Sequence, residues 1–125
     1  MINKIVQSGR EYIPKKVVRK TWGNEFWIVN TPKYCGKRIR VNSGAWSSKG
    51  RWHYHKEKDE TFIVIEGTLK LLIKIGDKEF EGLFIKDQCY RIPPGMRHKF
   101  TAVDGKCTFW EVSTHHDDSD TYYED

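Results

Sequence analysis

The segment RWHYHKEKDETFIVIEG, residues 51–67, carries most of the information about the fold class of this chain. His53 and His55 stand two residues apart, so on a β-strand both side chains project to the same face of the sheet. Glu60 follows after a short polar bend, and residues 61–66 form an apolar run that is typical of a strand. Two imidazoles that point the same way, with a carboxylate close by, form a metal-binding pattern.

A second segment, IPPGMRH at residues 92–98, contributes a third histidine, His98. Three imidazoles and one carboxylate suit a first-row transition metal and leave coordination positions open for water or substrate. We therefore predict that one divalent ion is bound by four side chains, those of His53, His55, Glu60 and His98. These ligand types do not choose among Zn, Mn, Fe, Co and Ni.

The two segments resemble the two sequence motifs of the cupin superfamily. The first motif is His-x-His, four residues, Glu, six residues and Gly, and the second is Pro-x-Gly-x-x-His. The matching residues are His53, His55, Glu60, Gly67, Pro93, Gly95 and His98. Positions that depart from the motifs are Ser47, Asp87 and Ala102, and none of them is a metal ligand. The resemblance implies an all-β fold, the double-stranded β-helix or cupin jelly-roll barrel, with the metal ligands facing its mouth.

The pattern of the remaining chain also predicts an all-β protein. Short strand-like runs, separated by turn residues, follow one another from about residue 25 to residue 113, and no amphipathic stretch is long enough for a helix. Within this region Gly67 and Asp104–Gly105 are predicted to be turns between successive strands. Many short strands at such spacing are typical of a β-sandwich or barrel, in agreement with the fold that the resemblance implies.

Length and composition predict a single domain over residues 1–125. We expect residues 1–20 to form an N-terminal strand or arm. We expect residues 114–125 to form an acidic C-terminal tail, with His115 and His116 in a flexible tip. The alternatives for these two histidines are that they cap the pocket or bind a second metal.

The start of the chain lacks the apolar core of a signal peptide, and no segment has the length of a membrane span. We therefore expect a cytoplasmic protein with no membrane partner. The cysteine count is odd, which favours reduced thiols, and Cys89 and Cys107 are expected to be small core residues because they lie in strand-like runs.

The formal net charge of +5 is by itself compatible with nucleic-acid binding. However, the basic residues are concentrated before the metal motif, the segment after His115 is acidic, and no basic helix or zinc-finger pattern is present. We therefore predict no nucleic-acid partner. Small anionic molecules would benefit more from this charge, and a solvated basic surface is the alternative.

Three further segments resemble the cupin domain of type II mannose-6-phosphate isomerases. Residues 20–23 resemble its Arg-Pro-Trp-Gly opening, residues 37–41 resemble its Lys-Arg-Ile-x-Val strand, and residues 120–125 resemble its closing segment. This resemblance implies a metal-dependent sugar or sugar-phosphate isomerase that exchanges aldose and ketose through an enediolate. Tyr123 stands where the closing segment of that family has an arginine.

Proton transfer between two sugar carbons needs a base within hydrogen-bond reach of the substrate. Lys58 resembles the lysine beside the metal in lyxose-type sugar isomerases, and a nearby cation with partial burial would lower its pKa. Glu111 is the second catalytic candidate, and Arg97, next to a predicted ligand, is the candidate substrate-binding residue. The alternatives are a solvated lysine, a structural ion pair for the glutamate and a solvated loop arginine.

Two other functions remain open on the sequence alone. A cupin with such a ligand set can hold iron for a dioxygenase reaction, or it can bind a sugar without turnover. In every case the partner is a small-molecule ligand, and we expect a sugar. We also expect a homodimer, because a small jelly roll has edge strands that a second copy can cover.

Overall fold

The structure of the protein is a computed structural model that describes residues 1–3 and 16–125. Of the expected N-terminal strand or arm, residues 16–20 form a strand, and residues 4–15 lie outside the described residues. Within the described part, no helix is long and apolar enough to cross a membrane.

Nine strands and two short 3-10 helices account for the regular structure of the described residues. The strands are β1 (Lys16–Lys20), β2 (Gly23–Asn30), β3 (Cys35–Val41), β4 (Trp52–Tyr54), β5 (Glu60–Ile75), β6 (Lys78–Phe84), β7 (Cys89–Ile92), β8 (Arg97–Ser113) and β9 (Tyr122–Glu124). The 3-10 helices are η2 (Ser47–Gly50) and η3 (Asp118–Asp120). The predicted all-β fold class is therefore confirmed.

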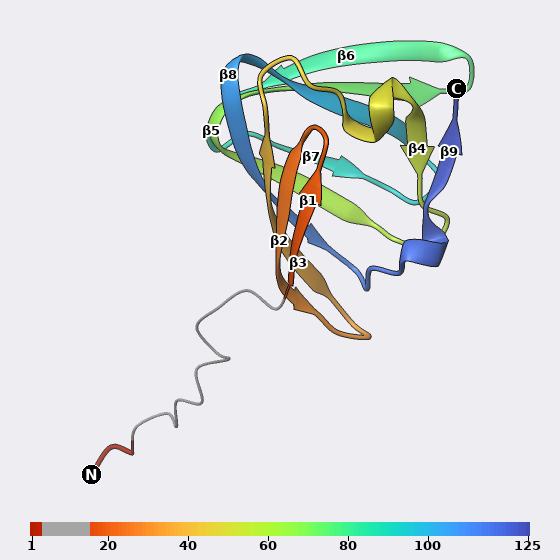
Figure 1. The fold of residues 1–125 in the computed structure, drawn as a ribbon. Helices are drawn as coiled ribbons and strands as arrows, with labels where there is room; N and C mark the ends of the chain where they lie inside the picture. The colour runs from red at the N-terminus through yellow and green to blue at the C-terminus, as the bar shows by residue number, and fades with distance from the viewer. Residues whose placement is uncertain (4–15) are drawn as a thin grey trace.

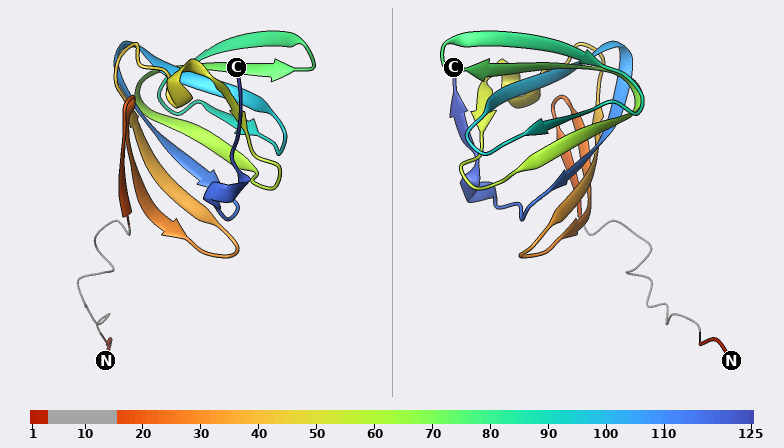
Figure 2. Two further views of the ribbon diagram at one scale, coloured as in Figure 1. Left: turned by 45° about the vertical axis from the view of Figure 1, so that its right-hand side comes forward. Right: turned by 180° about the vertical axis from the view of Figure 1, so that it is seen from behind.

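Strand β8 is the centre of the sheet, because it pairs with β3, β4 and β5. One side of the sheet continues from β3 to β2 and β1, and β4 pairs with β9. Strand β5 also pairs with β6 and β7. The sheet curls into a jelly-roll barrel in which β1–β3 and the β4–β9 pair lie on different sides, as the views in Figure 1 and Figure 2 show.

The predicted turns at Gly67 and Asp104–Gly105 are wrong, because both lie inside long continuous strands, β5 and β8. The two strands pair along most of their length, with a register shift on either side of Glu66, and the second shift contains Gly67. Gly67 has a φ of 79°, and a Cβ atom there would collide with the carbonyl oxygen of Lys106. The two strands therefore bend together at this close approach, which the sequence pattern presents as two separate turns.

The hydrophobic core contains a cluster of aromatic rings. The ring of Phe62 lies 4.6 Å from that of Phe109, and Phe100 packs edge-on against both Phe109 and Trp22. Such edge-to-face contacts stabilise a core beyond the area they bury. Trp22, Phe62 and Phe100 also line a pocket of the barrel, so the core forms part of its wall.

The two cysteines expected in the core behave differently. Cys107 is fully buried, as predicted, whereas Cys89 is exposed, so that prediction is wrong. Cys89 begins β7, which pairs only with β5 among the described strands, and its side chain faces solvent. Cys35, Cys89 and Cys107 are all free thiols.

Candidate metal centre

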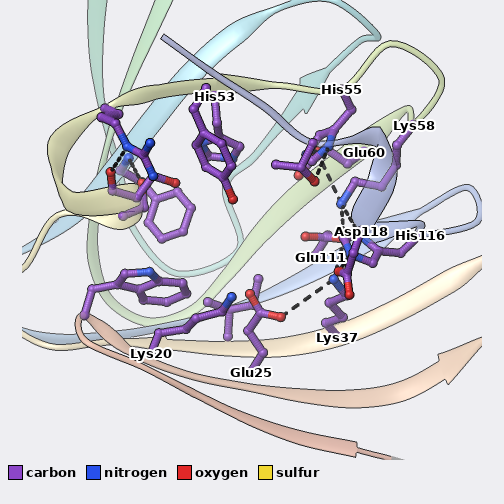
Figure 3. A pocket seen from close by; sticks show the side chains of 18 of the residues that line it. Lys20, Glu25, Lys37, His53, His55, Lys58, Glu60, Glu111, His116 and Asp118 are labelled. Atoms are coloured by element: carbon purple, nitrogen blue, oxygen red, sulfur yellow. Dashed lines mark hydrogen bonds and ion pairs between the residues drawn. The ribbon is translucent and has the colours of Figure 1, made fainter. Parts of the chain in front are cut away.

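The three histidines predicted as ligands lie together on the inner face of the barrel. His53 in β4 and His98 in β8 are directly opposite residues of adjacent antiparallel strands, with ring centroids 4.0 Å apart. The ring of His55 lies 5.6 Å from that of His53, as expected for side chains two residues apart on one face. One nitrogen from each ring lies within 4.8 Å of the others, which is within reach of one ion. Figure 3 shows His53 and His55 of this cluster.

Hydrogen bonds fix the direction of two of these rings. The Nδ1–H of His98 donates to the carbonyl oxygen of Met96 at 2.9 Å, and the Nδ1–H of His55 donates to that of Asp120 at 3.0 Å. Each ring therefore carries its lone pair on Nε2, which is the arrangement found in metal-bound histidines. Nε2 of His98 and Nδ1 of His53 are buried atoms with no hydrogen-bond partner. Buried polar atoms without partners are rare, and an ion bound at this cluster would supply a partner for Nε2 of His98.

Glu60 stands beside this cluster at the start of β5 and is buried. Its Oε2 atom lies 3.0 Å from Nε2 of His55, yet it has no hydrogen-bond donor. Since His55 carries its proton on Nδ1, two electron-pair donors face each other at this distance. A cation next to both atoms would turn this repulsion into coordination, so the position suits Glu60 as a fourth ligand.

The charge states of these side chains also suit a cation. Burial, together with the neighbouring His98, holds the pKa of His53 well below its ordinary value, and burial lowers the pKa of His98. Burial alone would raise the pKa of Glu60, but the positive charge of Lys58 holds it well below its usual range. Neutral imidazoles and an ionised carboxylate are the forms that a divalent metal requires, so the donor set fits one.

A pocket of about 540 Å³ is lined by His53, His55 and Glu60, and His98 is fully buried next to His53. We call these four side chains the metal wall (His53, His55, Glu60 and His98). Strands β1–β3 and η2 form other parts of the pocket lining. In η2, Ser48 and Lys49 have φ values of 51° and 56°, a left-handed conformation that is uncommon outside glycine. Such backbone conformations are found mostly where a loop serves a site.

The same pocket is lined by a second group of side chains, which we call the charged wall (Glu25, Lys37, Lys58, Glu111 and His116). Lys58 Nζ donates to Glu111 Oε2 at 3.1 Å, and Lys37 Nζ lies 4.0 Å from the same oxygen. Lys37 also lies 3.7 Å from Glu25 and 4.2 Å from the centroid of the Trp27 ring. Figure 3 shows these ion pairs as one chain of alternating charges along the pocket.

Lys58 connects the two walls, because its Nζ lies 3.7 Å from Oε2 of Glu60. The expectation that its pKa is lowered is wrong for the protein without metal. Burial does act in that direction, but the charges of Glu111 and Glu60 outweigh it and raise the pKa of Lys58 well above its ordinary value. Lys58 is therefore an ammonium group in the pocket, and Glu111 is a carboxylate in direct contact with it.

The C-terminal segment is an ordered part of the site, so the prediction of a flexible tip at His115 and His116 is wrong. Strand β9 pairs with β4, which places Tyr123 opposite His53. The carboxylate of Asp120 accepts hydrogen bonds of 2.9–3.2 Å from three successive backbone N–H groups. These belong to residues 56–58, so this carboxylate fixes the loop that follows the His-x-His motif.

Arg97 is not brought to the pocket. Its guanidinium forms two hydrogen bonds to the carboxylate of Glu124, at 3.1 and 2.8 Å, and lies 4.2 Å from the centroid of the Tyr54 ring. The next residue, His98, points inward because successive side chains of a strand face opposite sides. Arg97 therefore fastens β9 to the outside of the barrel, and we do not assign it to ligand binding.

Sequence reasoning missed one residue of the charged wall, Lys37. Lys37 is 2% exposed and lies on the inward face of β3, where Cys35, Ile39 and Val41 are also buried. The alternation of that strand could have identified it as an inward-facing charge. For His116, capping of the pocket was the alternative to a flexible tip, and no local signal favoured it, because its partners Asn30 and Lys58 lie 86 and 58 residues away.

The chain matches a known protein family over most of its length. The family described as the cupin domain matches residues 37–113, which include all four residues of the metal wall and both Lys58 and Glu111.

Two relatives are similar in sequence. An uncharacterized protein, YdbB of Bacillus subtilis (strain 168), is 38% identical over 74 residues, which are 59% of this chain and 58% of that protein. A mannose-1-phosphate guanylyltransferase of Salmonella montevideo is 30% identical over 93 residues, 74% of this chain but 18% of that protein. The chain thus spans little more than half of the first relative and less than a fifth of the second.

Solved structures share the fold. CapF, a capsular polysaccharide assembling protein of Staphylococcus aureus, superposes with a TM-score of 0.79 at 19% identity, over 95% of this chain and 34% of that chain. The oxalate decarboxylase of Bacillus subtilis superposes with a TM-score of 0.76 at 17% identity, over 86% of this chain and 29% of that chain. At these identities the likeness shows the fold alone.

Proposed function

The chain belongs to the cupin domain family, and on this basis we propose that it is a metal-dependent isomerase that exchanges the aldose and ketose forms of a sugar or sugar phosphate. The observation that carries the proposal is the buried Lys58–Glu111 pair, 3.1 Å apart. The pair stands 3.7 Å from Glu60, a proposed metal ligand. An acid and a base are thus held in contact at the edge of an open metal site.

The metal wall supplies the first requirement of this reaction. His53, His55, Glu60 and His98 would hold the ion on one side, so that its remaining positions face the pocket. When bound, a divalent ion would polarise the two sugar oxygens O1 and O2 and so acidify the proton on C2.

The Lys58–Glu111 pair supplies the second requirement, which is proton transfer. A Glu111 carboxylate oxygen takes the proton from C2 and returns it to C1. The ammonium of Lys58 donates an N–H to the oxygen on which negative charge develops, and it relays the hydroxyl proton from O2 to O1. Atoms and charge balance, because every proton that leaves the substrate returns to it.

The pocket rim supports a ligand that carries an anionic group. Four basic side chains line the pocket without forming an ion pair within the described residues. They are those of Arg19, Lys20, Lys49 and Arg51. The guanidinium of Arg51 lies 4.3 Å from the centroid of the Tyr123 ring. A guanidinium therefore stands beside the position at which the isomerase-like closing segment has an arginine, which supports a phosphorylated sugar.

The names of two similar proteins refer to sugars, which supports a sugar ligand for this chain. One relative is a mannose-1-phosphate guanylyltransferase, and one structural neighbour is a capsular polysaccharide assembling protein. The matched shares of those proteins are small, so we take from them only the class of ligand.

The test is an assay of aldose–ketose exchange with the full chain, using matched sugars and sugar phosphates and each of Zn, Mn, Fe, Co and Ni. We expect conversion of at least one pair, with no conversion after treatment with a chelator. Oxygen uptake with iron(II) instead would identify a dioxygenase. Tight binding of a sugar with no conversion under any metal would identify a binding module, and either result would overturn the isomerase proposal.

We further propose that the protein is a homodimer. Among the described strands, β1 pairs only with β2 and β6 pairs only with β5, so each has an open edge. Phe80 and Leu83 of β6 are about half exposed, at 49% and 58%. An apolar edge of this kind favours association with a second copy. Light scattering at micromolar concentration should give twice the mass of the chain, and the mass of one chain would refute the dimer.

A further inference from the structure

His116 lies in the pocket wall, although it belongs to the C-terminal segment that no motif covers. Its backbone is held on both sides by one side chain, because His116 N–H donates to Oδ1 of Asn30 and Nδ2 of Asn30 donates to the His116 carbonyl. The imidazole packs edge-on against Trp27, with ring centroids 4.9 Å apart. Backbone and ring are thus both fixed, which is unusual for a residue in a terminal segment.

The hydrogen bonds of this ring define its tautomer. Nε2 of His116 lies 2.8 Å from Oδ1 of Asp118, which can only accept, so Nε2 carries the proton. Nδ1 then carries the lone pair, and it faces Nζ of Lys58 at 3.1 Å. His116 is therefore an acceptor for the Lys58 ammonium, and Asp118 keeps it in that form.

The Lys58 ammonium has three N–H bonds, and three acceptors surround it. Glu111 and His116 each accept at 3.1 Å, which is a full hydrogen bond for an ammonium group. The third neighbour, Oε2 of Glu60, is 3.7 Å away and beyond that range. Two N–H bonds are thus engaged in the charged wall, and the third is directed toward the metal wall and is free to meet a ligand oxygen there.

We propose that His116, oriented by Asp118, is a positioning residue that aims the free N–H of Lys58 at a ligand bound on the metal wall. The inference rests on the proposed function for its catalytic consequence, since only there does Lys58 touch the substrate. The structural part of the inference, that His116 accepts a hydrogen bond from the Lys58 ammonium and so fixes its direction, rests only on the observed contacts.

His116→Leu and His116→Asn form a matched pair for the test. Leucine keeps the packing against Trp27 but accepts no hydrogen bond. Asparagine can place its side-chain oxygen where Nδ1 of the histidine stands, so it restores the acceptor without a titratable ring. His115→Asn is the control, because His115 is exposed and contacts the carbonyl of Thr31 outside the pocket.

With the Zn²⁺-loaded full chain, we expect His116→Leu to lower kcat by about 10–10²-fold, with KM, zinc content and thermal unfolding close to those of the wild type. His116→Asn should recover most of the loss, and His115→Asn should match the wild type. Unchanged kcat in His116→Leu would overturn the proposal. So would a His116→Asn variant as impaired as His116→Leu, because the acceptor would then not be the property that matters.

A second readout does not depend on turnover. Nitrogen-15 NMR of the same zinc-loaded proteins should show His116 protonated on Nε2 alone, and a slowly exchanging Lys58 ammonium signal in the wild type and His116→Asn. In His116→Leu that signal should shift or broaden away. If the wild type shows these signals but converts no sugar, the isomerase proposal fails and the positioning of Lys58 stands. If the Lys58 signal is the same in all variants, the positioning role is wrong, whatever the turnover.

Discussion

The metal wall and the charged wall both contribute side chains to one pocket, but their buried polar atoms find partners in different ways. In the charged wall each charge meets an opposite charge or a hydrogen-bond acceptor, as in the Lys58–Glu111 contact. In the metal wall, His53, Glu60 and His98 each keep a buried atom without a partner. The charged wall therefore pairs its polar groups by itself, whereas the metal wall needs a cation to pair its buried atoms.

The strongest effect should come from removing a ligand of the metal wall. His98→Ala should lower the affinity for the divalent ion by more than about 10²-fold, because losing a ligand costs more than losing its outer hydrogen bond. Metal content after dialysis, measured by mass spectrometry, checks this. His115→Asn, a histidine change outside both walls, should keep one ion per chain. Retention of the ion by His98→Ala would contradict the view that this wall needs a cation.

The next largest effect should come from replacing the proposed acid and base of the charged wall, Lys58 and Glu111. Glu111→Gln and Lys58→Met should each lower turnover by about 10²–10⁴-fold while the ion stays bound, because general acid–base groups contribute this much. Turnover and metal content of the same preparations check both statements. Lys58→Met also leaves the buried Glu111 with only the more distant Lys37 as a cationic neighbour, so we expect the variant to be less stable by up to about 3 kcal/mol. Full activity in both variants would remove the charged wall from catalysis.

The two walls should also differ in their response to pH in the metal-free protein. The pKa values of His53 and His98 lie below the ordinary 6.5, so the unfolded chain binds more protons once the pH falls below that value. The free energy of unfolding should therefore decrease as the pH falls below 6.5, by up to about 1.4 kcal/mol per pH unit for each group. Lys58 has a raised pKa, so its contribution is present below pH 10.5 and is lost as the pH rises above it.

Urea denaturation at a series of pH values measures how the free energy of unfolding changes with pH on the acid side and on the alkaline side. Replacing His98 by leucine should make the acid-side slope shallower, because one group that resists protonation in the folded state is gone. An unchanged slope would mean that His98 does not control acid stability. His116, whose pKa burial also lowers, adds to the acid-side loss, so some slope should remain in the variant.

The weakest effect is expected outside both walls, at Arg97. Arg97→Ala removes the pair with Glu124, whose side chains are 35% and 40% exposed, so the free energy of unfolding should fall by about 0.5–1 kcal/mol. Turnover should change little, since the guanidinium lies outside the pocket. Thermal unfolding and kinetics check this, and a loss of turnover with unchanged KM would show that fastening β9 also matters to the site.

Much of the metal wall could be predicted from the sequence because its geometry is mostly local. Residues two apart on a strand share a face, so His53 and His55 needed no tertiary information to point the same way. His98 was added from its residue type in a second segment, with support from the resemblance to a known family, and the structure places it directly opposite His53. The fold class followed equally well from strand-like runs, although the long bent strands β5 and β8 appeared in the sequence as shorter pieces.

Other parts of the site depended on how the barrel closes. Lys58 is 53 residues from Glu111 and 58 residues from His116 in the sequence. Only closure of the barrel brings it to 3.1 Å from each of them. The same closure turned Arg97 outward and ordered the C-terminal segment. Fold class and the kinds of metal ligand could be inferred from the chain alone, because strand periodicity fixes which side chains share a face. The chain alone could not show which charged side chains are buried together, because that depends on contacts between segments more than 50 residues apart.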